Sequence, residues 1–252
     1  MSRLDALRVK IFADGADFDS IVKLSQDPRI KGFTTNPTLV RKAGVADYEQ
    51  FGRKLLAAVP NHPVSLEVFA DDFDEMARQA KAIATWGPNV NVKIPVTNTR
   101  KEFCGDLIRE LSASGVAVNV TAIMTLDQVK RVTDCLAPGT PAIVSVFAGR
   151  IADTGVDPVP LMAESVNILK SKPKAELIWA SPRELLNVFQ ADEIGCQIIT
   201  VTGDILNKLS LVGKDLEAYS LETVEMFRRD AVGAGFEIKT DAGGQAKKAA
   251  AV

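Results

Sequence analysis

The sequence predicts a single (β/α)8 barrel with an additional C-terminal helix. Eight short apolar, β-branched runs recur at fairly regular intervals along the 252 residues, and segments with helical spacing lie between them. No Gly/Ser-rich linker divides the chain. Eight strand-helix repeats fit a closed parallel barrel better than an open doubly wound sheet, because such barrels reach about 250 residues as one domain.

The predicted strands are the eight apolar runs. In chain order they are RVKIFAD (8–14), KGFTTN (31–36), VSLEVFA (64–70), NVNVKIPV (89–96), VAVNVT (116–121), AIVSVFAG (142–149), AELIWAS (175–181) and CQIITVT (196–202). Two of the intervening helices are predicted over 72–86 and 126–137. Each has an aspartate near its start that can serve as an N-cap, Asp72 in the first and Asp127 in the second.

Two more helical patterns follow the last predicted strand, over 204–213 and 220–235. The second is longer than a helix that closes a barrel needs to be, so we expect that it can pack on a neighbouring subunit. We assign 1–238 to the barrel domain. Residues 239–252 are mostly small and polar, which predicts a disordered tail to which we assign no function.

The composition indicates a globular protein, with 46% hydrophobic and 25% charged residues. No apolar stretch approaches the roughly 18 residues that cross a bilayer. The first ten residues lack the apolar core of a signal peptide, so we expect a cytoplasmic protein that does not enter a membrane. The formal charge of −2 argues against a nucleic-acid partner but leaves room for local positive charge around a small anion.

Metal chemistry and histidine catalysis are not expected. Cys104, Cys135 and Cys196 are far apart and share no metal-like spacing. The single histidine, His62, lies in the Pro-rich stretch VPNHPV, which predicts a surface loop.

Lys93 is the sharpest candidate for a catalytic residue. In a barrel of this kind the active site lies at the C-terminal ends of the strands. Lys93 interrupts VNVKIPV, a run otherwise suited to a fully buried strand. A buried lysine is costly unless it is paired or used, and a neutral amine attacks ketones to form an imine. The alternative is that Lys93 points outward or ends the strand as a paired ion.

Polar residues at the ends of the other runs extend the candidate site. Asp14 can move the proton of a substrate hydroxyl as a carbon–carbon bond breaks, or it is a turn or N-cap residue. Asn36 precedes Pro37, so it is a cap or a ligand for substrate hydroxyls. Glu67 and Thr121 together can hold and activate a water, unless Glu67 forms an outward ion pair with a helix lysine.

A second group of polar residues predicts an anion site. Arg150 follows the sixth predicted strand, and Ser181 and Arg183 follow the seventh. Arginine binds phosphate through two parallel hydrogen bonds, and barrels often hold phosphate near their last strand-to-helix loops. Taken singly, each arginine is more often a surface charge.

Together these pieces resemble the transaldolase family, including its small members that are similar to fructose-6-phosphate aldolase, from residue 9 to about 236. The motifs are FADGAD with Asp14, GFTTNPTLV with Thr34 and Asn36, VSLEV with Glu67, VKIPVT with Lys93, NVTAI with Asn119 and Thr121, SVFAGRI with Ser145, Phe147 and Arg150, and WASPRE with Ser181 and Arg183. TTNP and VKIPVT together are quite specific.

The resemblance implies a transferase of the Schiff-base type. It would move a dihydroxyacetone unit from a ketose phosphate, of the fructose 6-phosphate or sedoheptulose 7-phosphate type, to an aldehyde acceptor in the pentose phosphate pathway. Lys93 would form the imine, and Asp14 would act as acid and base. Glu67 with Thr121 would position the catalytic water. No metal or organic cofactor is implied, since the protonated imine serves as the electron sink.

The resemblance also assigns the substrate contacts. Asn36 and Ser145 would contact the dihydroxyacetone portion, and Thr34, Asn119 and Phe147 would also be substrate-binding residues. The phosphate would be held by three residues near the last loops, Arg150, Ser181 and Arg183. The resemblance implies an assembly as well, since small family members form rings of five subunits, often stacked as ten, and longer members form dimers. A homo-oligomer is therefore expected.

Three alternatives stay open. In the family, aldolases that release free dihydroxyacetone resemble one another in having glutamine in place of Glu67 and tyrosine in place of Phe147, so both positions here are transaldolase-like. Gly15 and Pro182 depart from the common pattern, as they would in a transaldolase specialised for a modified sugar. From a different class of protein, a catalytically silent barrel that binds sugar phosphates would keep the fold without the chemistry.

Overall fold

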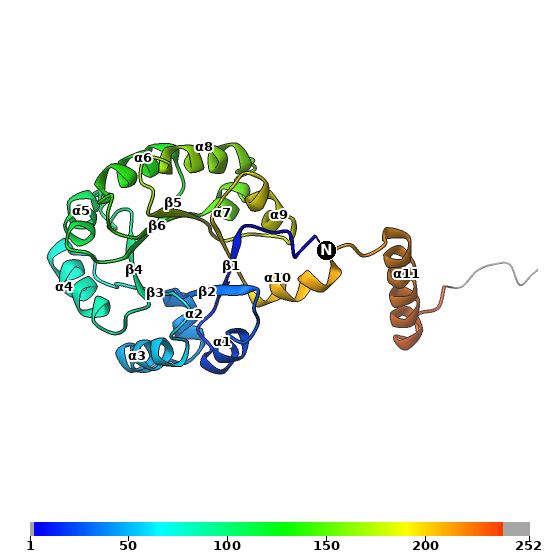
Figure 1. Cartoon of the computed structure of the whole chain (residues 1–252). Coiled ribbons are helices and arrows are strands. Elements are labelled where there is room, and N and C mark those ends of the chain that lie inside the picture. The colour runs from blue at the N-terminus through cyan, green and yellow to red at the C-terminus, as the bar shows by residue number, and fades with distance from the viewer. Residues whose placement is uncertain (1–2, 239–252) are drawn as a thin grey trace, which may run out of the picture. The chain divides into compact units, whose positions relative to one another are not determined.

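The computed structural model of the protein describes residues 3–238. Its eight strands are parallel to their neighbours and close into a barrel in chain order (Figure 1). They are β1 (Lys10–Asp14), β2 (Ile30–Thr34), β3 (Val64–Glu67), β4 (Val90–Pro95), β5 (Val118–Ile123), β6 (Ala142–Val146), β7 (Ala175–Trp179) and β8 (Ile198–Val201). Each predicted run overlaps one strand, so the predicted (β/α)8 barrel is confirmed.

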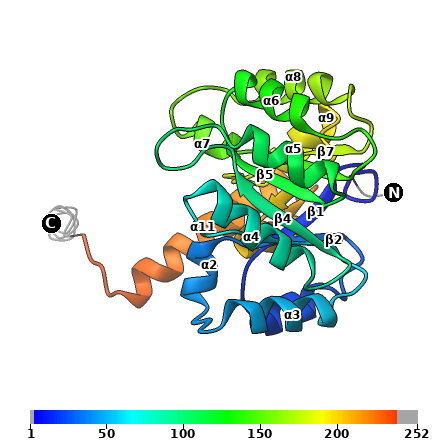
Figure 2. The ribbon, with the colours of Figure 1, turned by 90° about the vertical axis from the view of Figure 1, so that its left-hand side faces the viewer.

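The connecting helices lie outside the ring of strands, and Figure 2 gives the side view of the same ribbon (Figures 1 and 2). They are α1 (Phe18–Leu24), α2 (Pro37–Lys42), α3 (Tyr48–Ala58), α4 (Phe73–Ala84), α5 (Gly105–Ala113), α6 (Leu126–Cys135), α7 (Ala148–Ala152), α8 (Val159–Leu169), α9 (Leu186–Glu193) and α10 (Gly203–Asn207), then a 3-10 turn, η1 (Lys208–Leu211). Short helices α2 and α7 lie between a strand and the longer helix that follows.

Side-chain caps mark the start of some of the helices, including α4 and α6. Asp72 caps α4 as predicted, accepting a hydrogen bond from the backbone N–H of Glu75 (3.1 Å). The prediction for α6 was wrong, because its N-cap is Thr125 and Asp127 lies in the first turn. Thr125 and Gln128 form a reciprocal capping box that satisfies two free N–H groups, which an aspartate inside the first turn does not provide.

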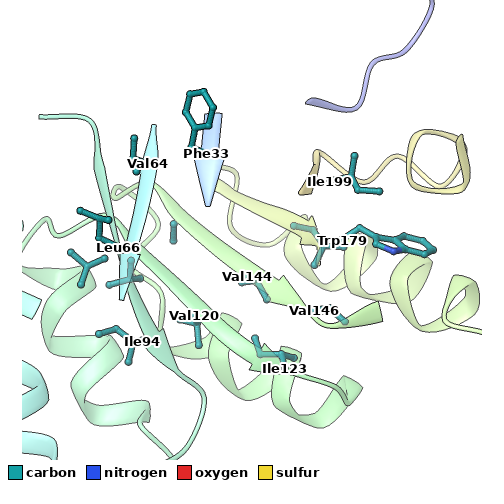
Figure 3. Packing of buried hydrophobic residues seen from close by; sticks show 14 of the residues in the cluster. Phe33, Val64, Leu66, Ile94, Val120, Ile123, Val144, Val146, Trp179 and Ile199 are labelled. Atoms are coloured by element: carbon teal, nitrogen blue, oxygen red, sulfur yellow. The ribbon is translucent and has the colours of Figure 1, made fainter. Parts of the chain in front are cut away.

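Apolar side chains on the outer face of the strands join the helices in one buried core. Leu66, Ile94, Val120 and Trp179 belong to this core together with helix residues such as Ile108 (Figure 3). Because side chains alternate along a strand, the direct sequence neighbours of these residues point into the barrel. The residues next to Leu66, Ile94 and Val120 include the polar candidates of the site.

A smaller apolar cluster fills part of the barrel interior. It contains Phe12, Ile143, Ile178, Ala180 and Ile198, with Phe147 packed against it. Gly32 faces Phe12 across the β1–β2 pairing, and a Cβ atom at this position would lie 2.5 Å from Cζ of the phenyl ring. The interior therefore combines an apolar packing layer with the polar side chains that follow it on the same strands.

The chain divides into two compact units, 1–210 and 211–252. In the second unit, α11 (Leu216–Gly233) begins four residues before the predicted pattern, at N-cap Asp215, and it buries none of its residues. The single domain over 1–238 stays a prediction, and the predicted tail of 239–252 lies outside the described residues. Among residues 3–238, no helix is both long and apolar enough to span a membrane.

Candidate active site

Polar side chains at the C-terminal ends of the strands line a cavity of about 620 Å³. All of the site residues predicted from the sequence line it: Asp14, Thr34, Asn36, Glu67, Lys93, Asn119, Thr121, Ser145, Phe147, Arg150, Ser181 and Arg183. They come from β1 to β7 and the loops that follow these strands, so only the closed barrel brings them together.

Lys93 points into the barrel and is buried, with 6% of its surface exposed. Its Nζ donates a hydrogen bond to the carbonyl oxygen of Thr35 (2.7 Å) and lies 3.0 Å from Oε2 of Glu67. Glu67 and Lys93 are register partners on adjacent strands, which puts both side chains on the inner face. The outward-facing alternatives for both residues are therefore wrong.

Tyr48 on α3 fixes the backbone of Glu67. Its hydroxyl accepts a hydrogen bond from the Glu67 N–H (2.8 Å), and its ring packs against Phe69 and Trp86. Burial raises the pKa of Tyr48 to about 12, so the phenol stays neutral. This contact orients the carboxylate that faces Lys93.

Asp14 ends β1 and is not a helix cap, because the N-cap of α1 is Asp17. Thr34 donates a hydrogen bond to Oδ1 of Asp14 (2.7 Å), and Asn36 Nδ2 lies 3.5 Å from Oδ2. Burial raises the pKa of Asp14 above its usual value, while the Thr34 hydroxyl and the charge of Lys93 act in the opposite direction.

Asn36 is the cap that the sequence offered, and its role as a ligand for substrate hydroxyls stays a prediction. Its side-chain oxygen accepts a hydrogen bond from the backbone N–H of Leu39 (3.0 Å), which makes it the N-cap of α2. The amide group of the same side chain faces Asp14 at the edge of the cavity. The cap holds the side chain in one orientation.

Hydrogen bonds link three buried polar side chains on β3, β5 and β6 inside the barrel. Ser145 Oγ donates to Oδ1 of Asn119 (2.7 Å), and Asn119 Nδ2 donates to Oγ of Ser65 (3.0 Å). All three residues are less than 4% exposed, and these bonds fix the amide orientation of Asn119. The Ser145 and Asn119 side chains are thereby held against the cavity.

The Thr121 hydroxyl lies on β5 at the cavity. Its Oγ1 is buried and has no hydrogen-bond partner among residues 3–238. The next residue, Ala122, has a φ of 63°, in the left-handed region, where the β5–β6 register shifts. A buried polar group without a partner is uncommon and suits a hydroxyl that binds a small molecule from the cavity.

The loop after β7 packs closely on α7. A Cβ atom on Gly149 would lie 1.5 Å from the carbonyl oxygen of Ser181, so only glycine permits this approach. Ser181 itself has a φ of 59°. The contact brings Arg150 on α7 to the same wall of the cavity as Ser181 and Arg183.

The two arginines at this wall differ in their partners. Arg183 Nε donates to Oδ1 of Asp153 (2.8 Å), and its Nη2 pairs with Oδ2 of the same carboxylate. Arg150 forms no ion pair within residues 3–238, although its guanidinium lies 5.7 Å from the ring centre of Phe147. Both arginines help to lower the pKa of Asp153, but only Arg183 is held in a direct two-bond pair with that carboxylate.

Comparisons with known proteins agree with this geometry. Residues 11–248 match the family described as Transaldolase/Fructose-6-phosphate aldolase. The chain is 38% identical over 202 residues to a probable transaldolase of Dehalococcoides mccartyi, covering 80% of this chain and 90% of that protein. This chain belongs to the transaldolase/fructose-6-phosphate aldolase family. It is also 33% identical to probable transaldolase 2 of Listeria monocytogenes, over 84% of this chain and 94% of that protein.

Solved structures of more distant proteins share the fold of this transaldolase/fructose-6-phosphate aldolase family member. A putative lyase/mutase from Burkholderia cenocepacia matches with a TM-score of 0.55 at 16% identity, over 90% of this chain and 87% of that one. A putative fructose-1,6-biphosphate aldolase from Coccidioides immitis matches with a TM-score of 0.55 at 14% identity, over 82% and 77%. These similarities bear on the barrel alone.

Sequence reasoning missed several residues of the site in this family member. Tyr48 and Asp153 hold Glu67 and Arg183, and Thr200, Thr202 and Asp204 complete the cavity wall at β8 and α10. Thr200 lies two residues after the apolar interior residue Ile198 on the same strand, so both side chains point to the same face. This alternation was the signal that would have placed Thr200 inside the barrel.

The three cysteines and His62, for which the sequence predicted no catalytic role, do not line the cavity. The three cysteines are buried and free, and burial raises the pKa of Cys104 and of Cys196 to about 12. His62 lies in a loop as predicted, with its ring 5.5 Å from that of Phe33. Within the described part of the chain, no three His, Cys, Asp or Glu side chains group closely enough to hold a metal ion.

Proposed function

We propose that this protein is a transaldolase that transfers a dihydroxyacetone unit from a ketose phosphate to an aldehyde acceptor through an imine on Lys93. The observation that carries the proposal is the buried Lys93 amine, which lies between the carboxylate of Glu67 and the Thr35 carbonyl in a cavity also lined by Asp14. Family membership supports the same chemistry, and a strictly structural lysine would not need a cavity at its amine.

Glu67 is the proton acceptor for the first step. The Lys93 ammonium gives a proton to the carboxylate 3.0 Å away, and the neutral amine attacks the C2 carbonyl of the ketose. The carbonyl oxygen leaves as water after it receives protons, and the product is a protonated imine. Thr121 supplies the second contact for this water through its unpartnered hydroxyl.

Asp14 is the acid and base of the carbon–carbon bond step. It accepts the proton of the C4 hydroxyl, the C3–C4 bond breaks, and the electron pair moves to the imine nitrogen to give an enamine. The aldehyde product leaves and an acceptor aldehyde enters. The enamine attacks the acceptor carbonyl, Asp14 returns its proton to the new hydroxyl, and water then hydrolyses the imine.

Two groups of residues contact the two ends of the substrate. Asn36 and Ser145 contact the hydroxyls of the dihydroxyacetone portion, with Asn119 holding Ser145 and the α2 cap holding Asn36. Substrate phosphate binds beyond the ends of β6 and β7, where Arg150, Ser181 and Arg183 line the cavity. In this proposal Arg150 supplies most of the positive charge, because Arg183 shares its charge with Asp153.

Phe147 favours transfer over release of free dihydroxyacetone. Its ring lines the cavity and packs on the interior apolar cluster, so this position has no hydroxyl that could bind the hydrolytic water. The three-carbon enamine then survives until an acceptor arrives. An aldolase that releases dihydroxyacetone is the second candidate function, and a transaldolase specialised for a modified sugar is the third.

The experiment that tests the proposal measures transfer and release side by side. The protein is incubated with fructose 6-phosphate, with and without an aldose phosphate, and free dihydroxyacetone and the new ketose phosphate are quantified. We expect the new ketose phosphate only when the acceptor is present, with little free dihydroxyacetone. Release without acceptor at the rate of turnover would identify an aldolase instead, and Lys93→Ala is the inactive control.

A further inference from the structure

The hydroxyls of Thr34 and Thr200 form a chain that ends on Asp14. Thr34 Oγ1 lies 2.7 Å from Oδ1 of Asp14 and 2.5 Å from Oγ1 of Thr200. Both threonines are buried, at 4% and 7% exposure, and Thr200 also lines the cavity. The chain runs from β8 across β1 to β2, which the closure of the barrel makes neighbours on either side of Asp14.

The single proton of each hydroxyl fixes the direction of this chain. When Asp14 is ionised, Thr34 must donate its proton to the carboxylate, so only Thr200 can donate in the contact between the two hydroxyls. When Asp14 is protonated, its carboxyl O–H can donate a hydrogen bond to the Thr34 hydroxyl, and Thr34 then donates its own hydrogen bond to Thr200. The chain reverses, and both states of Asp14 are hydrogen-bonded.

Such a reversal matters at a buried carboxyl that must both take and give a proton. Burial disfavours the ionised form of Asp14, and the charged groups that act on it are Lys93 on β4, which favours ionisation, and Glu67 on β3, which opposes it. The uncharged neighbours are Thr34 and Asn36 on the β2 side and Thr200 on β8. A hydroxyl that is itself a hydrogen-bond acceptor donates more strongly to a charge, so Thr200 strengthens the Thr34 bond most in the ionised state.

We propose that Thr200 is a positioning residue that acts through Thr34 to set the protonation of Asp14 during carbon–carbon bond cleavage and formation. This inference rests on the proposed function for its role in catalysis, but the coupling itself is a property of the three side chains. Thr200 touches no substrate atom in this account.

The direct test is the titration of Asp14 in the protein without substrate. Aspartate labelled with 13C at the carboxyl carbon is followed by NMR against pH, and the Asp14 signal is assigned as the one missing from Asp14→Asn. We expect Thr200→Val to titrate at higher pH than the wild type, because the ionised form loses more hydrogen bonding than the neutral form. Thr200→Ser, which keeps the hydroxyl, should titrate like the wild type.

A double-mutant cycle tests whether the effect passes through Thr34. In the Thr34→Val background, replacing Thr200 by Val should cause no further shift, since the link between the two hydroxyls is already broken. Thr133→Val is the matched control, because Thr133 is another buried threonine, and its hydroxyl bonds to the Val129 carbonyl on α6. If Thr200→Val proves unstable, Thr200→Ala replaces it.

Activity gives the second readout. On the acid side of the pH profile, Thr200→Val should lower kcat by about 2- to 12-fold, the range for loss of one hydrogen bond, with a much smaller loss on the plateau. An unshifted Asp14 titration in Thr200→Val and Thr200→Ala, or a shift that persists in the Thr34→Val background, would overturn the inference. If no ketose phosphate reacts, the proposed function fails, while the NMR titration still decides the coupling.

Discussion

The Lys93 amine and the Glu67 carboxylate face each other across adjacent strands, with 3.0 Å between Nζ and Oε2. A buried ion pair is weak evidence for stability, since the desolvation of two charges offsets much of their attraction. This pair lies at the cavity, and the Glu67 backbone is itself held by Tyr48. The arrangement is better explained by the proposed proton transfer from the Lys93 ammonium to Glu67 than by a contribution to folding.

Asp14→Asn should be more stable than the wild type at neutral pH and nearly inactive. The raised pKa of Asp14 means that the folded state binds this proton more tightly than the unfolded state. The stability from this group is therefore complete below about pH 3.8, the ordinary value, and is lost as the pH rises through the folded-state pKa. Urea unfolding of both proteins across this window measures the effect, and kcat should fall by about 10²- to 10⁴-fold.

The pH dependence of the stability difference between Asp14→Asn and the wild type provides a control. The stability advantage of Asp14→Asn should shrink as the pH falls below that window, because the wild-type carboxyl is then neutral too. An advantage that is independent of pH would contradict the assignment of a buried, hard-to-ionise Asp14.

Thr121→Val should leave stability unchanged or slightly raised, while activity falls. The substitution keeps the side-chain shape and removes a buried hydroxyl that has no partner among residues 3–238. Loss of the water contact should slow imine formation and hydrolysis by at least about 10-fold. Thermal unfolding and single-turnover kinetics separate the two effects, and Thr121→Ser should restore the rate. A large loss of stability would instead assign the hydroxyl a structural role.

Tyr48→Phe should lower the free energy of unfolding by about 1–3 kcal/mol, because the partly buried N–H of Glu67 loses its acceptor. Activity should fall with it, since Glu67 is then less well oriented toward Lys93. The chain has two tyrosines, so Tyr219→Phe on α11 is a matched control that should change neither quantity. Equal effects of the two substitutions would argue against the anchoring role of Tyr48.

Arg150→Ala should weaken binding of a phosphorylated donor more than Arg183→Ala does. Arg150 has no carboxylate partner in the described part of the chain, whereas Arg183 is paired with Asp153. We expect KM for fructose 6-phosphate to rise about 10- to 100-fold in Arg150→Ala, the range for a charged hydrogen bond. Arg183→Ala should raise it less, and fructose without the phosphate should not distinguish the two variants. The reverse order of effects would contradict the assignment.

Much of the fold was predictable because a parallel barrel buries both faces of its strands, so each strand is an apolar run in the sequence. Lys93 stood out for the same reason, as a charge inside such a run. Strand ends were less predictable. Asn36 belongs to a predicted strand by composition, but its side chain caps α2 and the strand ends at Thr34.

Three of the missed residues share a different property, because each is hydrogen-bonded to another residue of the site: Thr200 to Thr34, Tyr48 to Glu67 and Asp153 to Arg183. Strand alternation places Thr200 inside the barrel, but its β-branched side chain is that of an ordinary strand former and does not indicate its bond to Thr34. Tyr48 lies at the start of an amphipathic helix, where an aromatic ring is normal core material. Asp153 lies before Thr154 and Gly155 and resembles a turn residue. Each role depends on a contact between distant segments, which no local pattern records.

The measurement that tests the central claim most directly is chemical trapping of the imine. The protein is incubated with fructose 6-phosphate or sedoheptulose 7-phosphate, reduced with borohydride and mapped by peptide mass spectrometry, with Lys93→Ala as the control. We predict a three-carbon dihydroxyacetone adduct on the peptide that contains Lys93, and none in the variant. Transfer activity without an adduct on Lys93, or an adduct on another lysine that persists in Lys93→Ala, would contradict the account.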